Sequence, residues 1–158
     1  MPTIKRITAE PYNVPLEGSL KWGKGHELKH LEHVLIKVEL SDGSVGIAEA
    51  TPRPSIYGET QVSVLHIIEH HLSPIWLGEM IDSFSAVEKL TSRMELIKGN
   101  NTAKGALDMA MHHALAQSQT AMLADYLGAT KPKILVSYIV STGTTDAVIR
   151  DVKSAYAA

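Results

Sequence analysis

Small and apolar residues recur at helical spacing between residues 99 and 117. Positions i, i+3, i+4, i+7, i+8 and i+11 of this stretch are Ala103, Ala106, Leu107, Ala110, Met111 and Ala114. Small side chains let neighbouring elements approach closely, and a surface helix rarely needs such a stripe. We therefore expect this helix to be the central one of the fold, with Asn101 or Thr102 as its N-cap.

Alternation with a period of two predicts three antiparallel strands before the helices. In the clearest one, 31–40, one face carries Val34, Ile36, Val38 and Leu40 and the other carries His33, Lys37 and Glu39. Asp42-Gly43 is a hairpin turn signal that leads into a strand at 44–50. A strand at 4–14 contains Pro11, which fits the edge of a sheet. Such a meander needs helices over its apolar face.

Two connections carry residues that suit contact with a ligand. The segment 16–29 is polar and contains three glycines, so we expect a loop; Trp22 in it either offers a contact surface or folds back onto the core. The segment 51–59 begins Thr-Pro-Arg-Pro, and its prolines fix φ and bar helix. It presents Ile56 and Tyr57, either as one wall of a pocket or packed on their own domain.

Three further helices are predicted after these connections, at 61–72, 83–97 and 122–127. Pro74 lies just past the first, which is typical of a helix stop, and Gly99 ends the second.

The last part of the chain has a different pattern. Residues 134–140 are nearly all β-formers, as in a strand buried on both faces of a parallel sheet, and a helix follows at 146–157. No earlier segment has the pattern of a parallel partner for this strand. We therefore expect an α+β domain at 1–130 and a second domain, 131–158, that stops unfinished at Ala158.

Composition limits the possible partners. The chain has 158 residues, of which 44% are apolar and 20% charged, and a formal charge of −2, so it offers no basic field for nucleic acid. No apolar run is long enough to span a membrane, and the start lacks a secretory signal. The absence of cysteine excludes disulfides and thiolate sites. We expect a cytoplasmic protein without a nucleic-acid or membrane partner.

No catalytic constellation emerges from the residues themselves. His66, Glu69 and His70 have the spacing of a metal site on one helical face, but a solvated polar face is the favoured interpretation. His112 and His113 point about 100° apart on a helix and so do not share an ion easily. The sequence contains neither a Gly-x-Ser-x-Gly elbow nor a glycine-rich phosphate loop.

Several motifs nevertheless resemble one family. These are the run Gly99-Asn100-x-x-Ala103-Lys104-x-Ala106-Leu107-Asp108-Met109-Ala110, the segment Gly46-Ile47-Ala48-Glu49-Ala50 and the triplet Tyr57-Gly58-Glu59. Together with the order of the elements, they resemble the mandelate racemase and muconate-lactonising type of the enolase superfamily. The resemblance implies a capping domain, built of a three-stranded meander and a helical bundle, followed by the first β/α unit of an incomplete modified TIM barrel.

The resemblance also implies a chemistry. In that family Mg²⁺ stabilises an enediolate formed when a proton next to a carboxylate is removed, and barrel lysines and carboxylates do this work. All of those positions would lie beyond Ala158, so we expect this chain alone to be inactive and to bind no metal. The implied partners are a small carboxylate substrate, the missing barrel and further copies in a homo-oligomer.

What the chain would retain is contact with the substrate. By resemblance, we expect the substrate-binding residues to be Trp22, Lys24, His26, Ile56, Tyr57 and Ile139. Ile139 stands where related subgroups often have threonine, which leaves the substrate open.

The Tyr57-Gly58-Glu59 triplet favours muconate cycloisomerisation, with dipeptide epimerisation as the alternative. A stand-alone α+β binding module and association with a separately supplied barrel are the other hypotheses.

Overall fold

The computed structural model describes residues 1–23, 25–131, 133–140 and 143–157. They form two compact units, Met1–Tyr12 with Glu32–Ala129 and Asn13–Leu31 with Thr130–Ala158. The chain passes between the units within two strands, β1 (Ile4–Trp22) and β2 (His26–Leu40), and again after Ala129. The predicted domain division at residue 130 stays a prediction.

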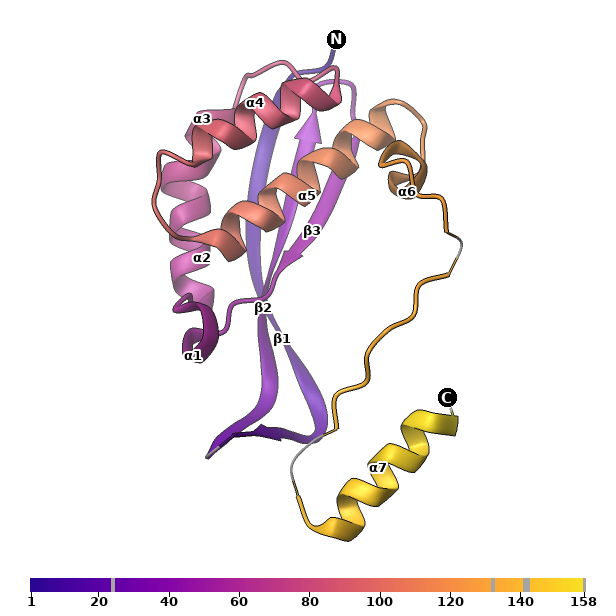
Figure 1. The fold of residues 1–158 in the computed structure, drawn as a ribbon. Helices are drawn as coiled ribbons and strands as arrows, with labels where there is room; N and C mark the ends of the chain where they lie inside the picture. The colour runs from indigo at the N-terminus through magenta and orange to yellow at the C-terminus, as the bar shows by residue number, and fades with distance from the viewer. Residues whose placement is uncertain (24, 132, 141–142, 158) are drawn as a thin grey trace. The chain divides into compact units, whose positions relative to one another are not determined.

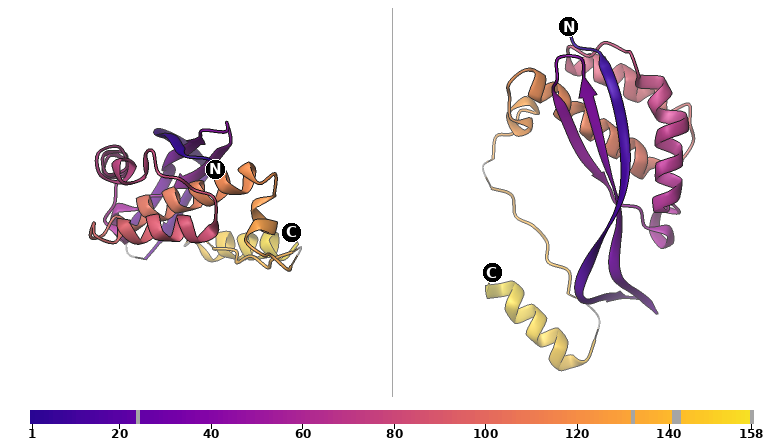
Figure 2. Two further views of the ribbon diagram at one scale, coloured as in Figure 1. Left: turned by 90° about the horizontal axis from the view of Figure 1, so that it is seen from above. Right: turned by 180° about the vertical axis from the view of Figure 1, so that it is seen from behind.

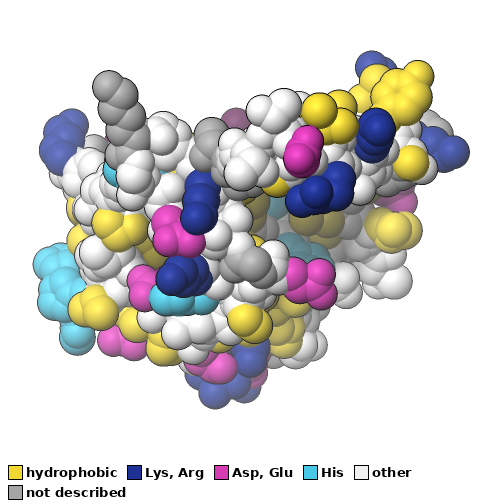
Figure 3. All heavy atoms as spheres, turned by 90° about the horizontal axis from the view of Figure 1, so that it is seen from below, with side chains coloured by type: hydrophobic (Ala, Val, Ile, Leu, Met, Phe, Trp, Pro, Cys, Tyr) yellow, Lys and Arg dark blue, Asp and Glu magenta, His cyan; other side chains and the backbone are white. Residues whose placement is uncertain are grey.

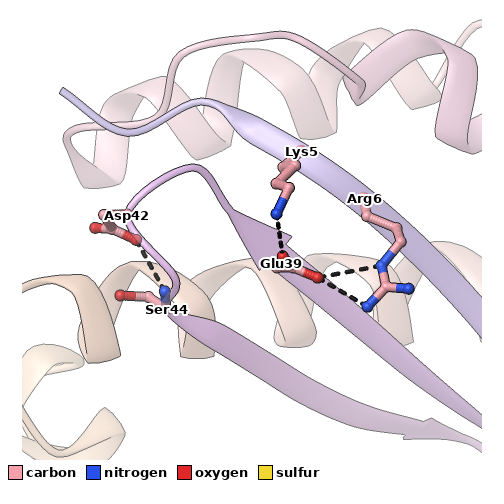
Figure 4. Close-up of polar contacts among 5 residues, drawn as sticks. All are labelled: Lys5, Arg6, Glu39, Asp42 and Ser44. Atoms are coloured by element: carbon pink, nitrogen blue, oxygen red, sulfur yellow. Dashed lines mark hydrogen bonds and ion pairs between the residues drawn. The ribbon is translucent and has the colours of Figure 1, made fainter.

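The first unit is built on the predicted meander. Its sheet has the order β1-β2-β3, and β3 (Val45–Ala50) pairs antiparallel with β2, with Val34 opposite Ala50. In the turn between them the backbone N–H of Ser44 donates to Asp42 Oδ1 over 2.9 Å. Glu39 ties β2 to β1 through Lys5 at 2.7 Å and Arg6 at 2.8 Å (Figure 4). The predicted α+β class is confirmed.

Helices cover one face of this sheet (Figures 1 and 2). The longer ones are α2 (Gln61–Ile67), α4 (Phe84–Met94) and α5 (Asn101–Ser118), and the short ones are α1 (Pro54–Tyr57), α3 (Ser73–Trp76) and α6 (Leu123–Tyr126). The core between the layers contains the predicted β2 face, whose members are fully buried: Val34, Ile36, Val38 and Leu40. None of the described helices is long and apolar enough to cross a membrane.

The alanine stripe of α5 packs against β3, as predicted for the central helix. All six of its members are buried: Ala103, Ala106, Leu107, Ala110, Met111 and Ala114. The strand approaches so closely that a Cβ added to Gly46 would lie 1.9 Å from the Ala110 carbonyl oxygen. The small residues on both elements therefore allow the backbones to meet.

The predicted helix at 61–72 is not a single α-helix. After α2 the chain forms a π-helical turn, η1 (Ile68–Leu72), and then α3, so Pro74 lies inside a helical turn and not past the end. Proline has no N–H for an α-helical bond, but it fits the first turn of a new helix. The wider π-helical turn connects α2 to α3, and its residues Ile68 and Leu72 stay buried.

The predicted loop at 16–29 is wrong. Strands β1 and β2 continue through it as a hairpin, and the described turn residues Gly23 and Gly25 have φ of +56° and +86°. Two strands that supply each other's hydrogen bonds stay extended without an apolar pattern, which is why alternation did not reveal them. We call residues 13–31 the ribbon.

The other part of the second unit only partly follows the sequence prediction. The described residues 133–140 form no strand, and their apolar side chains up to Ile139 are exposed, Leu135 fully. A strand exists only through a hydrogen-bonding neighbour, and the described residues give this segment none. The helix after it is confirmed as α7 (Thr145–Ala157).

Candidate functional site

An open hollow of about 590 Å³ lies at one end of the first unit. Three elements line it: the end of β3 with Glu49, the segment around α1 with Ile56 and Tyr57, and the start of α5 with Asn100 and Met109. Two of the predicted substrate-binding residues, Ile56 and Tyr57, therefore lie together in one hollow.

Helix α1 holds these two side chains, contrary to the prediction that the prolines bar helix. Pro54 occupies its first turn, where the missing N–H costs nothing. Gly58, with φ of +76°, ends it, and its N–H donates to the Pro54 carbonyl. Ile56 is 58% and Tyr57 60% exposed. Of the two interpretations of this segment, the structure thus favours a pocket wall over packing on its own domain.

The N-terminus of α5 is capped by a residue that the sequence did not predict as a cap. The predicted N-caps are wrong, because the N-cap is Asn100, which has φ of +57° and makes no side-chain cap bond. Glu59, which is 7% exposed, accepts the backbone N–H groups of Thr102 at 2.9 Å and Ala103 at 3.3 Å. A carboxylate at a helix N-terminus satisfies free donors and complements the helix dipole. No local pattern identifies a cap from 43 residues away.

A polar cluster joins the three strands beside the hollow. His33, predicted on the solvent face, is instead 8% exposed, because Tyr12 of β1 and Glu49 of β3 flank it. Its Nδ1 lies 3.3 Å from the Tyr12 hydroxyl and 3.4 Å from Glu49 Oε2. Burial, together with the hydrogen bond and charge of Glu49, raises the pKa of Tyr12 to about 12. The phenol therefore stays protonated at neutral pH.

The lining of the hollow suits an apolar group better than an anion. Its apolar part comes from Ile56, Tyr57 and Met109, and its charged members are the carboxylates Glu49 and Glu59. No lysine or arginine is among the described lining residues. A carboxylate ligand would therefore need its cation from other residues. On the face in Figure 3, lysine and arginine side chains lie interspersed with acidic ones.

The remaining described residues of the predicted site, Trp22, His26 and Ile139, lie in the second unit. The rings of Trp22 and His26 stack, with centroids 5.5 Å apart and planes 12° apart. Trp22 is half-buried, and both interpretations of its role stay predictions. Lys24 lies outside the described residues, and Ile139 is 72% exposed. Their contact with substrate stays a prediction.

The histidines do not form a metal centre. His66 lies 4.7 Å from His70 and 5.6 Å from His71 between ring centroids, but within the described residues no group of three or more His, Cys, Asp or Glu is arranged to hold a metal. His112 Nδ1 lies 3.2 Å from the Tyr126 hydroxyl, and His113 Nδ1 accepts the backbone N–H of Ile47 at 3.1 Å. These last two histidines therefore help to pack α5 against α6 and β3.

Solved structures define the class to which this fold belongs. The chain matches a muconate lactonizing enzyme from Mycobacterium smegmatis, solved with muconolactone, with a TM-score of 0.88 and 35% identity over 96% of this chain and 40% of that one. The architecture is that of the N-terminal domain of enolase-superfamily structures.

The family follows from the sequence. The family model for the mandelate racemase / muconate lactonizing enzyme N-terminal domain matches residues 20–128, and the chain belongs to this family. An L-Ala-D/L-Glu epimerase from Bacillus subtilis is 29% identical over 96% of this chain, and a chloromuconate cycloisomerase from Cupriavidus necator is 30% identical over 80%. The chain spans 40% and 34% of the length of these relatives. The predicted resemblance is thus confirmed.

Proposed function

We propose that the first unit is the substrate-specificity cap of a muconate cycloisomerase-like enzyme, which removes the proton next to a substrate carboxylate. The observation that carries this proposal is the exposure of two large apolar side chains, Ile56 and Tyr57. Both lie on the short helix α1, whose end is fixed by the Gly58 cap, and both line the hollow. Exposed apolar side chains on a rigid segment are typical of a binding surface.

In this role the hollow excludes water and holds the apolar middle of the substrate. Glu49 and Glu59 disfavour a second anion inside it, so the substrate carboxylates would point away from these two residues. The stacked pair of Trp22 and His26, with Lys24, would contribute further contacts from the ribbon, and Ile139 from the segment after the helices.

Magnesium is part of the proposal for the complete enzyme, where it would stabilise the negative charge that develops on the carboxylate. The described residues do not fit that ion, because no group of three or more potential ligands among them is arranged to hold a metal. We propose that its ligands and the acid–base groups belong to a barrel domain, that the enzyme is a cytoplasmic homo-oligomer, and that this chain alone is inactive.

A second candidate is dipeptide epimerisation. The observation in its favour is that the Bacillus subtilis epimerase is 29% identical to this chain over 96% of its length. Both reactions pass through an enolate next to a carboxylate, which the epimerase forms by removing a proton and the cycloisomerase forms when a carboxylate oxygen adds to the conjugated double bond, so the cap would serve either one.

The test is an assay of the natural gene product that contains this chain against cis,cis-muconate and L-Ala–L-Glu, with residues 1–158 alone as the matched control. We expect turnover of muconate by the complete product and none by the control. Turnover of the dipeptide alone would replace the first candidate by the second. Turnover of neither substrate would refute both.

A further inference from the structure

Three consecutive residues bond to four different elements of the first unit. Glu59 caps α5 through two backbone N–H groups. Thr60 caps α2 in a capping box with Ser63, whose N–H donates to Thr60 Oγ1 at 3.1 Å. The Gln61 amide, Nε2, donates to the Tyr12 carbonyl at 3.1 Å and to the His33 carbonyl at 2.8 Å, and so joins β1 to β2. We call residues 59–61 the node.

The bonds of Gln61 lie where the strands enter the ribbon. Tyr12 is the last residue of the first unit in β1, and His33 follows Glu32, with which that unit resumes in β2. An amide NH₂ has two donors, and here each strand accepts one. The side chain of His33, which is 10% exposed, lies between Tyr12 and Glu49, at the same position along the strands as the bonds of Gln61. Backbone and side-chain bonds thus converge at the base of the ribbon.

We infer that Gln61 is a positioning residue that orders the ribbon by fixing the two strands where they enter it. We call residues 51–59, which contain α1, the α1 segment. Glu59 and Thr60 fix its end to α5 and α2, while Gln61 fixes the two strands that carry Trp22 and His26. The two segments proposed to contact the substrate therefore depend on three adjacent residues. The inference rests on the proposed function only where it assumes that the ribbon contacts the substrate.

The test replaces Gln61 by methionine in the natural gene product, which keeps the length of the side chain and removes both donors. Amide hydrogen exchange is measured in the ribbon and, separately, in residues 34–40. We expect exchange in the ribbon to become about tenfold faster, because two hydrogen bonds at its base are lost, while 34–40 stays unchanged. Gln117→Met is the matched control, since the Gln117 amide contacts His113 on α5, 3.3 Å away, and should leave the ribbon unchanged.

The outcomes separate this inference from the proposed function. Faster ribbon exchange with a higher KM at unchanged kcat supports both. Faster ribbon exchange with an unchanged KM supports the positioning role and refutes contact between ribbon and substrate. Unchanged ribbon exchange overturns the inference. If Gln61→Met abolishes cooperative unfolding, Gln61→Asn, one methylene shorter, is judged by the same exchange measurement.

Discussion

Replacing Gly46 by alanine tests the contact between β3 and α5. The added Cβ would lie 1.9 Å from the Ala110 carbonyl oxygen, 2.3 Å from the Ala114 nitrogen and 2.8 Å from the Ala114 Cβ. Two of these atoms belong to the helix backbone and cannot rotate away. Strand and helix must therefore separate by about 1 Å, which also weakens the dispersion contacts of the alanine stripe.

The expected cost follows from that geometry. Overpacking a core commonly costs about 1–3 kcal/mol, and because backbone atoms block the site here we expect about 3 kcal/mol or more. That is a large part of the stability of an ordinary domain, about 5–15 kcal/mol. Urea unfolding followed by far-ultraviolet circular dichroism measures the change as a shift of the midpoint.

Two further variants make the result specific. Gly105→Ala, in the same helix with nothing within 4 Å of the added carbon, should stabilise the protein by about 0.5–1 kcal/mol. Ala114→Gly removes only the 2.8 Å contact and so should not rescue Gly46→Ala. A Gly46→Ala midpoint close to that of the wild type, or full rescue by Ala114→Gly, would refute the close contact between the backbones of β3 and α5.

Three other predictions concern single groups. Glu59→Ala should cost about 1–2 kcal/mol in urea unfolding by leaving the first turn of α5 uncapped, and Glu59→Gln, which loses the charge but keeps an acceptor oxygen, should cost less; a Glu59→Gln variant as stable as the wild type would argue against a role for the charge. Since the pKa of Tyr12 is raised from 10.0 to about 12, the unfolded chain loses this proton first, so stability should fall as pH rises from 10 to 12. Tyr12→Phe should lack that part of the slope, and identical slopes would contradict the raised pKa. Hydrogen bonds from Ser118 and Ser44 lower the pKa of Asp42, so its contribution is present above its ordinary pKa and is lost on acidification. Asp42→Asn should flatten the acid limb of the stability curve, and an unaltered limb would exclude this contribution.

Local patterns were sufficient for much of the fold. The alanine stripe of α5 and the alternation of β2 each encode one buried face, and both faces are buried in the structure. The Asp42-Gly43 turn is likewise local, because the Asp42 side chain bonds to Ser44, two residues on, and Gly43 has φ of +89°.

Long-range partners were not predictable. The cap of Glu59 and the burial of His33 both depend on residues that are distant in the sequence and adjacent only in the fold. The sequence did not predict the ribbon, because its two strands satisfy each other's backbone hydrogen bonds and have no buried face that would produce an alternating pattern. In the candidate site, Ile56 and Tyr57 were singled out from the segment 51–59 and predicted as substrate contacts by family resemblance, whereas their exposure on a short helix required the structure.

The central claim, that the α1 segment contacts the substrate, is tested most directly by the KM of Tyr57→Ala in the natural gene product. Leu96→Ala is the control, since Leu96 is 84% exposed and lies outside the described lining of the hollow. The account predicts that Tyr57→Ala raises the KM for the accepted substrate about tenfold or more at nearly unchanged kcat, because the exposed ring becomes covered when substrate binds and contributes binding but no chemistry. Leu96→Ala should leave both constants as they are. Equal KM values for Tyr57→Ala, Leu96→Ala and the wild type would contradict the claim.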